Sequence, residues 1–280
     1  MTPRTTTATT IQATGLKDVF LSYGRRESLG FVARLHRLLK LNGHDCWFDK
    51  VNIPDGDDYQ QRIEYGIASA HNFVFVMSPH SLCSPYCLME LEYARLCGKR
   101  IAPLNHIAAT KAPEEPLSAE AKNALQGFYQ RHGLPDPGIA TFPQVQERVL
   151  SFIGGIDWLD AKEVMTAEDC AALAAWAQPY ANQWYRHENS ELLKKLLIPP
   201  FGQPVDTLES VLERLENVLR TEKSYVEAHT RLLLQAQEWD AGQRPNGHLL
   251  VGQERKDAED WLLQPFSGER ERPCTPTGLQ

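Results

Sequence analysis

The sequence predicts an α/β protein built on a doubly wound parallel sheet, followed by a mainly helical C-terminal extension. Short apolar runs alternate four times with helical patterns between residues 17 and 104. The run at 72–78 is apolar between its ends, as strands buried on both faces of a parallel sheet are. The connections between the runs are short, which favours successive strand–helix–strand units.

The elements of this α/β unit follow one another without long gaps. Asn42-Gly43 ends the first predicted helix, and a Pro-Asp-Gly turn lies in the loop 50–58 that follows the second strand. Ser84 is placed to cap the third helix, whose first turn contains Pro85. The predicted elements are strand 17–23, helix 28–41, strand 44–49, helix 58–69, strand 72–78, helix 85–97 and strand 100–104.

Beyond residue 105 the pattern is mostly helical. One long amphipathic helix is expected over 206–240, and its apolar stripe either packs on the α/β unit or forms an oligomer seam. The other expected elements are helices 118–131, 143–153, 166–178, 180–197 and 254–263, an edge strand at 156–159 and a linker at 199–204. We therefore divide the chain into a disordered lead-in (1–15), an α/β domain (16–160), a helical extension (161–265) and a Pro-rich tail (266–280).

Composition excludes several classes of function. The formal net charge of −7 gives no basic footprint for nucleic acid or for an anionic membrane surface. No apolar run approaches the roughly 20 residues that span a bilayer, and the lead-in lacks the apolar core of a signal peptide. Six cysteines without short-spaced pairing indicate reduced thiols in a cytoplasmic protein: Cys46, Cys83, Cys87, Cys97, Cys170 and Cys274.

A ligand site is expected where the strand order reverses, which for a flavodoxin-like order lies between the first and third strands. Two predicted loops, 22–28 and 78–84, border this point. In the first loop Gly24 permits close backbone approach, and Arg25 and Arg26 can reach phosphates.

The helix after the second loop presents a candidate catalytic side chain. Tyr86, Glu90, Tyr93 and Cys97 share one helical face, so Glu90 lies between the core stripe and the predicted cleft, whereas Glu92 is expected to point to solvent. A half-desolvated carboxylate beside aromatic rings suits the stabilisation of a developing cation. On position alone, an ordinary solvated helix glutamate remains the simpler interpretation.

Five motifs in register resemble the TIR (Toll/interleukin-1 receptor) domain, and in particular its NAD-consuming branch. Within them, Tyr86-Cys87-Leu88-Met89-Glu90 resembles the family pattern around the catalytic glutamate, with Tyr where Trp is more usual. The resemblance therefore implies that Glu90 is catalytic. The motifs are Asp18–Tyr23, Trp47–Asp49 with Ile53–Gly56, Asn72–Pro79, Ser84–Leu91 and Gly98–Leu104.

The resemblance also implies roles for other residues. Trp47 is expected to pack in the core, and Asp49 to order the loop that follows it. The loop 50–58 would join TIR domains to one another through Ile53, Pro54, Asp55 and Gly56. The residues expected to bind substrate are Ser22, Tyr23, Gly24, Arg25, Arg26, Ser78 and Tyr86.

By resemblance, the activity is that of an NAD glycohydrolase, which releases nicotinamide and leaves ADP-ribose or a cyclic isomer. NAD is the substrate, and no cofactor or metal is required, so Cys83, Cys87 and nearby His80 are interpreted as ordinary side chains rather than as a metal site. The resemblance further implies that self-association activates the enzyme in bacterial antiphage defence, with low activity for a dilute monomer. Two alternatives stay open: a non-enzymatic TIR adaptor that signals by assembly, and an enzyme whose cyclic product is a signal.

The C-terminal part carries a second resemblance. Residues 224–239, 249–252 and 258–262 resemble the stretch that follows TIR domains in large bacterial multidomain proteins. We therefore expect either an N-terminal piece of such a protein or a short relative of it.

Overall fold

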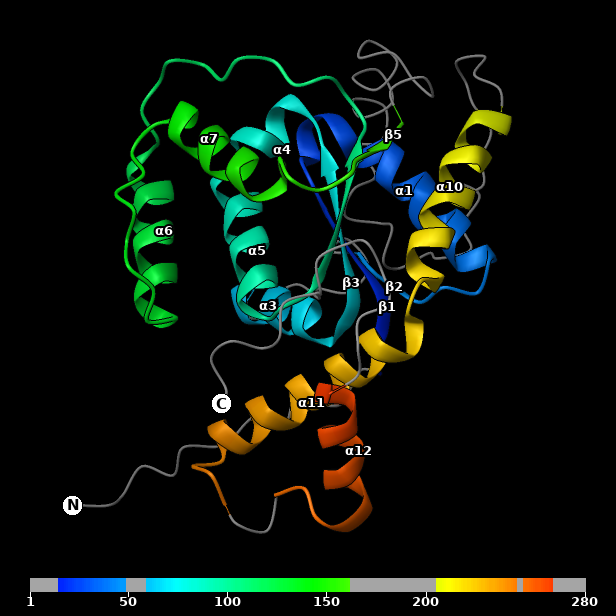
Figure 1. Cartoon of the computed structure of the whole chain (residues 1–280). Helices are drawn as coiled ribbons and strands as arrows, with labels where there is room; N and C mark the ends of the chain where they lie inside the picture. The colour runs from blue at the N-terminus through cyan, green and yellow to red at the C-terminus, as the bar shows by residue number, and fades with distance from the viewer. Residues whose placement is uncertain (1–14, 49–58, 162–204, 246–248, 264–280) are drawn as a thin grey trace, which may run out of the picture.

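The computed structural model describes residues 15–48, 59–161, 205–245 and 249–263. It contains a five-stranded, all-parallel sheet with the order β2-β1-β3-β4-β5 (Figure 1). This confirms the predicted α/β class and the flavodoxin-like strand order. The strands are β1 (Lys17–Tyr23), β2 (Cys46–Trp47), β3 (Ala70–Met77), β4 (Arg100–Asn105) and β5 (Leu159–Asp160).

Helices cover both faces of the sheet. The described helices are α1 (Arg25–Leu41), α3 (Tyr59–Ser69), α4 (Pro79–Cys83), α5 (Pro85–Leu96), α6 (Ala119–Arg131), α7 (Phe142–Ile153), α10 (Val205–Arg220), α11 (Lys223–Ala241) and α12 (Gly252–Leu263). Figure 1 shows α1 and α10 on one side of the sheet and α5, α6 and α7 on the other. None of the described helices combines the length and apolar character that crossing a bilayer requires.

The central strand β3 explains how the two layers form. Every residue of β3 is buried, and successive side chains point to opposite faces. Val74 and Val76 pack with α1 and α10, whereas Phe73 and Phe75 pack in the core that contains α5, α6 and α7. An uninterrupted apolar strand is therefore what a sheet covered on both faces requires.

Several predicted boundaries need correction. Helix α1 begins at Arg25, three residues early, because Gly24 already has extended N-cap geometry and its carbonyl accepts from the Ser28 backbone N–H. The predicted loop 78–84 contains the short helix α4, capped by Ser78. Strand β2 has only two residues, and the edge strand pairs at Leu159–Asp160 rather than at 156–159.

The prediction of one long helix over 206–240 is wrong, because the chain turns between α10 and α11. Glu222, at the turn, has a left-handed φ of 50°. The Arg100 guanidinium donates hydrogen bonds to the carbonyls of Leu219 and Thr221, which have no partner within a helix that ends there. Both helices bury apolar side chains against the α/β unit. The apolar pattern therefore continues across the turn, and the sequence alone does not reveal that the helix ends there.

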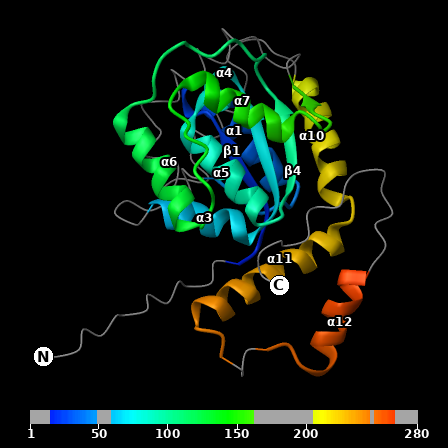
Figure 2. The same cartoon turned by 60° about the vertical axis from the view of Figure 1, so that its left-hand side comes forward.

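The C-terminal helices pack on the α/β unit. This confirms the first of the two expectations for the apolar stripe, packing on the α/β unit. Four α10 side chains lie in the core on the α1 face of the sheet: Val211, Leu212, Leu215 and Leu219. Helix α11 crosses the end of the sheet at which β1 and β3 begin (Figure 2), where Thr230 donates to the Ala70 carbonyl over 3.4 Å. Helix α12 is held on α11 by a 3.1 Å hydrogen bond from Trp261 Nε1 to the Tyr225 carbonyl.

Several predicted segments lie outside the described residues. These are the lead-in apart from Gly15, the whole loop 50–58, the helices 166–178 and 180–197, the linker and the Pro-rich tail. The domain limits at 160 and 265 stay predictions.

A buried lysine joins α11 to the α/β unit. Lys99, only 4% exposed, donates from Nζ to the Ala68 carbonyl over 2.7 Å and to Thr230 Oγ1 over 3.2 Å. Burial lowers the pKa of Lys99 to about 7. Its neighbour His229 is also buried, and burial together with the Lys99 charge lowers the pKa of His229 to about 3.

Buried histidines should make the fold sensitive to mild acid. Burial lowers the pKa of His106 to about 3, as it does for His229, so both are neutral in the folded protein. Below pH 6.5 the unfolded chain takes up a proton at each, so each removes about 1.4 kcal/mol of stability per pH unit. Urea unfolding should therefore give a free energy of unfolding about 4 kcal/mol lower at pH 5 than at pH 7.

The variant His229→Gln provides the control for this pH dependence. It removes one of the two imidazoles with the most strongly lowered pKa, so the loss between pH 7 and pH 5 should shrink by about 2 kcal/mol. Equal unfolding free energies for the original chain at the two pH values would contradict the burial of neutral imidazoles.

Candidate functional site

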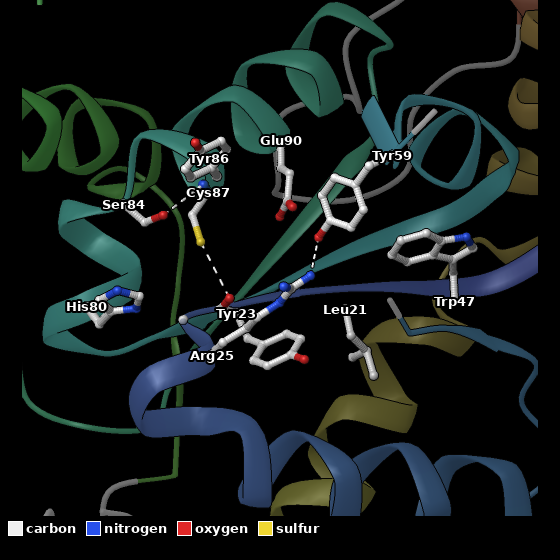
Figure 3. Close-up of a pocket in the computed structure, with 11 residues that line it drawn as sticks. Leu21, Tyr23, Arg25, Trp47, Tyr59, His80, Ser84, Tyr86, Cys87 and Glu90 are labelled. Atoms are coloured by element: carbon white, nitrogen blue, oxygen red, sulfur yellow. Dashed lines mark hydrogen bonds between the residues drawn. The ribbon is translucent and has the colours of Figure 1, made fainter. Parts of the chain in front are cut away.

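A pocket of about 220 Å³ opens at the carboxyl ends of the strands, beside the point where the strand order reverses between β1 and β3 (Figure 3). It is therefore located where the sequence predicts a ligand site. Its walls come from the ends of β1 and β2, from α4, and from the N-terminal turns of α1, α3 and α5. The lining residues are Leu21, Tyr23, Gly24, Arg25, Trp47, Tyr59, His80, Ser84, Tyr86, Cys87 and Glu90.

Gly24 sets the width of the pocket floor where β1 passes into α1. A Cβ at this position would lie 2.7 Å from the Ser81 backbone nitrogen and 2.9 Å from His80 Nδ1. The φ of Gly24 is −78°, so close approach, and not a left-handed backbone, is what requires glycine here. The same junction is held by a 3.1 Å hydrogen bond from the His80 backbone N–H to Glu27 Oε2.

The Glu90 carboxylate is fixed by a serine on β1. Ser22 Oγ donates to Glu90 Oε2 over 2.6 Å, the short distance expected for a hydroxyl bonded to a charged acceptor. Ser22 is 1% exposed, whereas Glu90 is partly exposed on the pocket wall. The buried Ser22 thus binds the carboxylate from the side away from the pocket, so a ligand in the pocket would contact Glu90 and not Ser22.

Cys87 lies one turn before Glu90 on α5. Its Sγ donates to the Tyr23 carbonyl over 3.5 Å, and the thiol is buried. Burial, reinforced by the nearby Glu90 charge, raises the pKa of Cys87 far above its usual range. A thiol held neutral in this way is unsuited to nucleophilic attack, so Cys87 packs the site without reacting in it.

Arg25 and Tyr59 form a bridge across the open side of the pocket. The Arg25 guanidinium donates to the Tyr59 hydroxyl and lies 5.4 Å from the centre of the Tyr59 ring. Figure 3 shows this side chain extending between the end of β1 and Tyr59, on the side that Glu90 faces. A cation placed here, in reach of ligand, can bind phosphate.

Aromatic side chains border the pocket on two sides. Tyr86 is 46% exposed at the rim. Trp47 is buried and stacks on Phe20 with ring centroids 4.4 Å apart, which confirms its predicted core packing, although one part of it also reaches the pocket. The sequence did not predict Tyr59 as a pocket residue, because Tyr59 follows the loop 50–58 and the sequence does not determine the path of that loop.

The structure gathers some of the predicted substrate residues and separates others. Tyr23, Gly24, Arg25 and Tyr86 line the pocket with Glu90. Three do not: Ser22 lies behind Glu90, Arg26 is exposed outside the lining, and Ser78 is fully buried, where its Oγ accepts from the Ser81 backbone N–H over 3.2 Å. The predicted assembly residues Ile53, Pro54, Asp55 and Gly56, and also Asp49, lie outside the described residues.

Glu92, also on α5, is buried away from the pocket, so the prediction that it points to solvent is wrong. It is 7% exposed, and its Oε1 accepts from Tyr129 OH and from Arg148 Nε, each over 2.9 Å. Both partners come from helices far along the chain, α6 and α7, and they compensate the burial of the charge.

Within the part of the chain that the structure describes, no group of three or more His, Cys, Asp or Glu side chains is arranged to hold a metal. The four described cysteines are buried and free of disulfide bonds: Cys46, Cys83, Cys87 and Cys97. What the pocket offers is a carboxylate that accepts a hydrogen bond from Ser22, a facing guanidinium and aromatic walls. This combination can hold a cationic or aromatic group that is joined to phosphate.

Comparison with known proteins locates this site in a recognised domain. Residues 19–133 match the family model described as TIR domain. The 2' cyclic ADP-D-ribose synthase BtTIR of Bacteroides thetaiotaomicron is 29% identical over 75 residues, which are 27% of this chain and 26% of the relative. The NAD(+) hydrolase PdTIR of Paracoccus denitrificans is 27% identical over 75 residues, 27% of this chain and 25% of the relative.

A third relative extends the match slightly. The probable 2' cyclic ADP-D-ribose synthase TcpB of Brucella abortus is 27% identical over 89 residues, 32% of this chain and 36% of the relative. The matched region thus spans about a quarter to a third of these relatives.

Two solved structures of TIR domains also match this chain. The TIR domain of the Toll-related receptor TRR-2 from Hydra magnipapillata has a TM-score of 0.34 at 12% identity, covering 64% of this chain and 98% of that one. The TIR domains of the activated Roq1 resistosome give a TM-score of 0.39 at 16% identity, covering 58% of this chain and 98% of that one.

Proposed function

Residues 19–133 form a TIR domain, and we propose that it cleaves the bond between nicotinamide and ribose in NAD, with Glu90 as the catalytic residue. The observation that carries the proposal is the Glu90 carboxylate, held by Ser22 over 2.6 Å in a pocket at the switch point of the sheet. The names of the similar bacterial proteins, an NAD hydrolase and two 2' cyclic ADP-D-ribose synthases, support the same substrate.

The proposed chemistry needs little from the protein beyond charge and position. Nicotinamide is already cationic in NAD and departs as a neutral base with the electron pair of the broken bond. The ribose carbon that remains becomes oxocarbenium-like, and the Glu90 carboxylate stabilises this developing charge. Water then attacks the carbon and loses a proton, giving ADP-ribose. Attack by the substrate's own adenine or ribose hydroxyl instead gives a cyclic isomer.

The size of the pocket bears on how NAD would bind. About 220 Å³ is less than the ~300–1,000 Å³ typical of sites that enclose a drug-sized ligand. We therefore place the nicotinamide and its ribose beside Glu90 and Tyr86, and the pyrophosphate at Arg25. The adenosine would lie outside the pocket, where a second copy of the chain completes the site through the loop 53–56. Activity would then depend on self-assembly, and we propose a cytoplasmic role in bacterial antiphage defence.

The direct test is to incubate concentrated protein with NAD and to separate the products by chromatography. We expect free nicotinamide together with ADP-ribose, a cyclic isomer or both. The ratio of the last two distinguishes a simple hydrolase from an enzyme that makes a signal. Unchanged NAD in a sample whose assembly is verified by light scattering would favour the non-enzymatic adaptor.

Ser22 should act as a positioning residue. Replacing Ser22 with alanine removes the hydrogen bond that orients the Glu90 carboxylate but no group that contacts substrate. A hydrogen bond to a charged group contributes about 1.5–3 kcal/mol, so we expect kcat to fall about tenfold or more while KM changes little. An equal rise in KM with unchanged kcat would instead indicate that Ser22 contacts the substrate directly.

A further inference from the structure

A second cavity of about 180 Å³ lies where β1 and β3 begin, at the opposite end of the strands from Glu90. We call it the junction pocket, because the TIR domain and the C-terminal helices both form its walls. The domain contributes the starts of β1 and β3 and the turn before β2, and the extension contributes the end of α10 and the start of α11. The lining residues are Asp18, Asn42, Gly43, His44, His71, Asn72, Leu219, Arg220, Lys223 and Val226.

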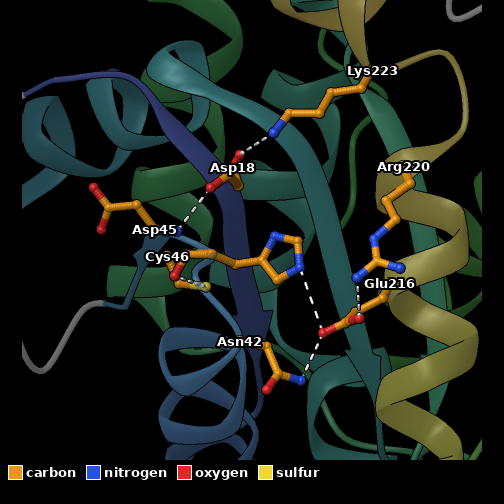
Figure 4. A network of polar contacts seen from close by, with 8 residues as sticks. Asp18, Asn42, Asp45, Cys46, Glu216, Arg220 and Lys223 are labelled. Carbon is orange, nitrogen blue, oxygen red and sulfur yellow. Dashed lines mark hydrogen bonds and ion pairs between the residues drawn. The ribbon is translucent and has the colours of Figure 1, made fainter.

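Two cations lie at the mouth of the junction pocket, each held by a carboxylate (Figure 4). Arg220 Nη2 is 2.8 Å from Glu216 Oε2, whereas Lys223 Nζ lies between two carboxylates, 3.6 Å from Glu227 Oε1 and 3.9 Å from Asp18 Oδ1. The Arg220 and Lys223 side chains are 65% and 53% exposed, so most of their donors remain accessible. Both residues line the pocket, and an ammonium and a guanidinium have further donors beyond those directed at these carboxylates.

Two imidazoles line the pocket below these cations. His71 is only 7% exposed, and its buried Nδ1 has no hydrogen-bond partner among the described residues. His44 Nε2 is likewise without a hydrogen bond there, its nearest charged neighbour being Glu216 Oε1 at 3.6 Å. Buried polar atoms are almost always satisfied in folded proteins, so two such atoms in one polar cavity indicate a group that is bound from solution.

We propose that the junction pocket binds a phosphate group carried by a small molecule, and that its occupancy strengthens the docking of α10 and α11 on the TIR domain. A guanidinium, an ammonium and two imidazoles, all able to donate, line one small volume, and the Asp18 carboxylate that lines it too is paired with Lys223. A metal ion is a poorer fit, because no set of three ligating side chains in the described residues is suitably arranged.

The coupling to docking follows from where the donors originate. His44 and His71 belong to the domain, whereas Arg220 and Lys223 belong to the extension, so the complete donor set exists only when the two parts are packed together. A ligand that needs all of them binds the docked state and shifts the equilibrium toward it. This inference does not depend on the proposed NAD cleavage, which is assigned to the pocket at the other end of the strands.

The test uses inorganic phosphate as the probe and the full chain as the protein. Thermal unfolding is followed across a phosphate series, with sodium chloride at matched ionic strength as the reference. We expect a midpoint that rises with phosphate, and an apparent affinity weakened about tenfold in Arg220→Gln and in Lys223→Gln. The control Arg255→Gln removes a similar exposed pair, Arg255 with Glu259 at 2.7 Å, and should respond like the original chain.

Three results would overturn the proposal. One is no phosphate-specific rise in the midpoint. Another is an equal rise in all variants, which would mean an adventitious ion only. The last is a response lost in Arg25→Gln but kept in Arg220→Gln, which would place the phosphate beside Glu90. Imidazole proton resonances give a second measurement independent of variant stability, since those of His44 and His71 should shift with phosphate and those of His106 should not.

Discussion

The variant Glu90→Gln should lose at least about a hundredfold of the NAD-cleaving rate while its fold stays intact. Glutamine has the same shape and keeps an oxygen that can accept from Ser22, whose hydroxyl is 2.6 Å from the carboxylate. Only the negative charge is removed, and that charge is what would stabilise the oxocarbenium-like transition state. The measurement is the initial rate of nicotinamide release at equal protein concentration.

The matched control for this variant is its thermal unfolding midpoint. Glu90 is partly exposed, so we expect the midpoint to change by no more than about 2 °C. A retained rate would show that the carboxylate has no catalytic role. A lost rate with a greatly lowered midpoint would show that Glu90 serves mainly to stabilise the fold.

The variant Glu92→Ala should give the opposite result: a loss of about 3 kcal/mol in the free energy of unfolding with the rate per folded molecule unchanged. Glu92 is 7% exposed and accepts hydrogen bonds from both Tyr129 and Arg148, each 2.9 Å away. Its removal leaves the buried Tyr129 hydroxyl without this acceptor. The measurement is urea unfolding with a parallel NAD assay well below the midpoint.

A conservative variant keeps the Glu92 prediction interpretable. Glu92→Gln retains an oxygen that can accept from Tyr129 and loses only the charge facing Arg148, which is itself 38% exposed. Its cost should be about 1 kcal/mol. If Glu92→Ala unfolds at the same urea concentration as the original chain, the contacts of Glu92 with α6 and α7 contribute nothing to stability.

These two glutamates also show how far the sequence alone could lead. The alternation of strands and helices, the apolar strand β3 and the start of α5 at Ser84 and Pro85 follow from local patterns, and the structure confirms them. The strand order, which the structure also confirms, is a property of the fold class rather than of any local pattern. Helical periodicity placed Glu90 at the edge of the core stripe, but it assigned Glu92 to solvent, whereas Glu92 is only 7% exposed. Arg148, which draws Glu92 inward, lies 56 residues away along the chain, and no periodicity reports such a contact.

The other corrections have the same origin in tertiary contacts. A polar residue at the end of a strand is a reasonable substrate ligand, yet Ser22 faces Glu90 and Ser78 caps α4. The turn between α10 and α11 depends on Arg100, which lies about 120 residues before it and donates to the carbonyls at the end of α10. Each of these depends on a partner that the fold, and not the neighbouring sequence, supplies.

The most direct test of the proposed function is nicotinamide release per molecule, measured for the original chain and for Glu90→Gln across a wide series of protein concentrations. We expect the original chain to release nicotinamide at a specific rate that rises steeply with concentration, because assembly must overcome the entropic cost of association. Glu90→Gln should stay at background throughout. Equal rates for the two proteins, or no release by the original chain in a verified assembly, would contradict the proposal.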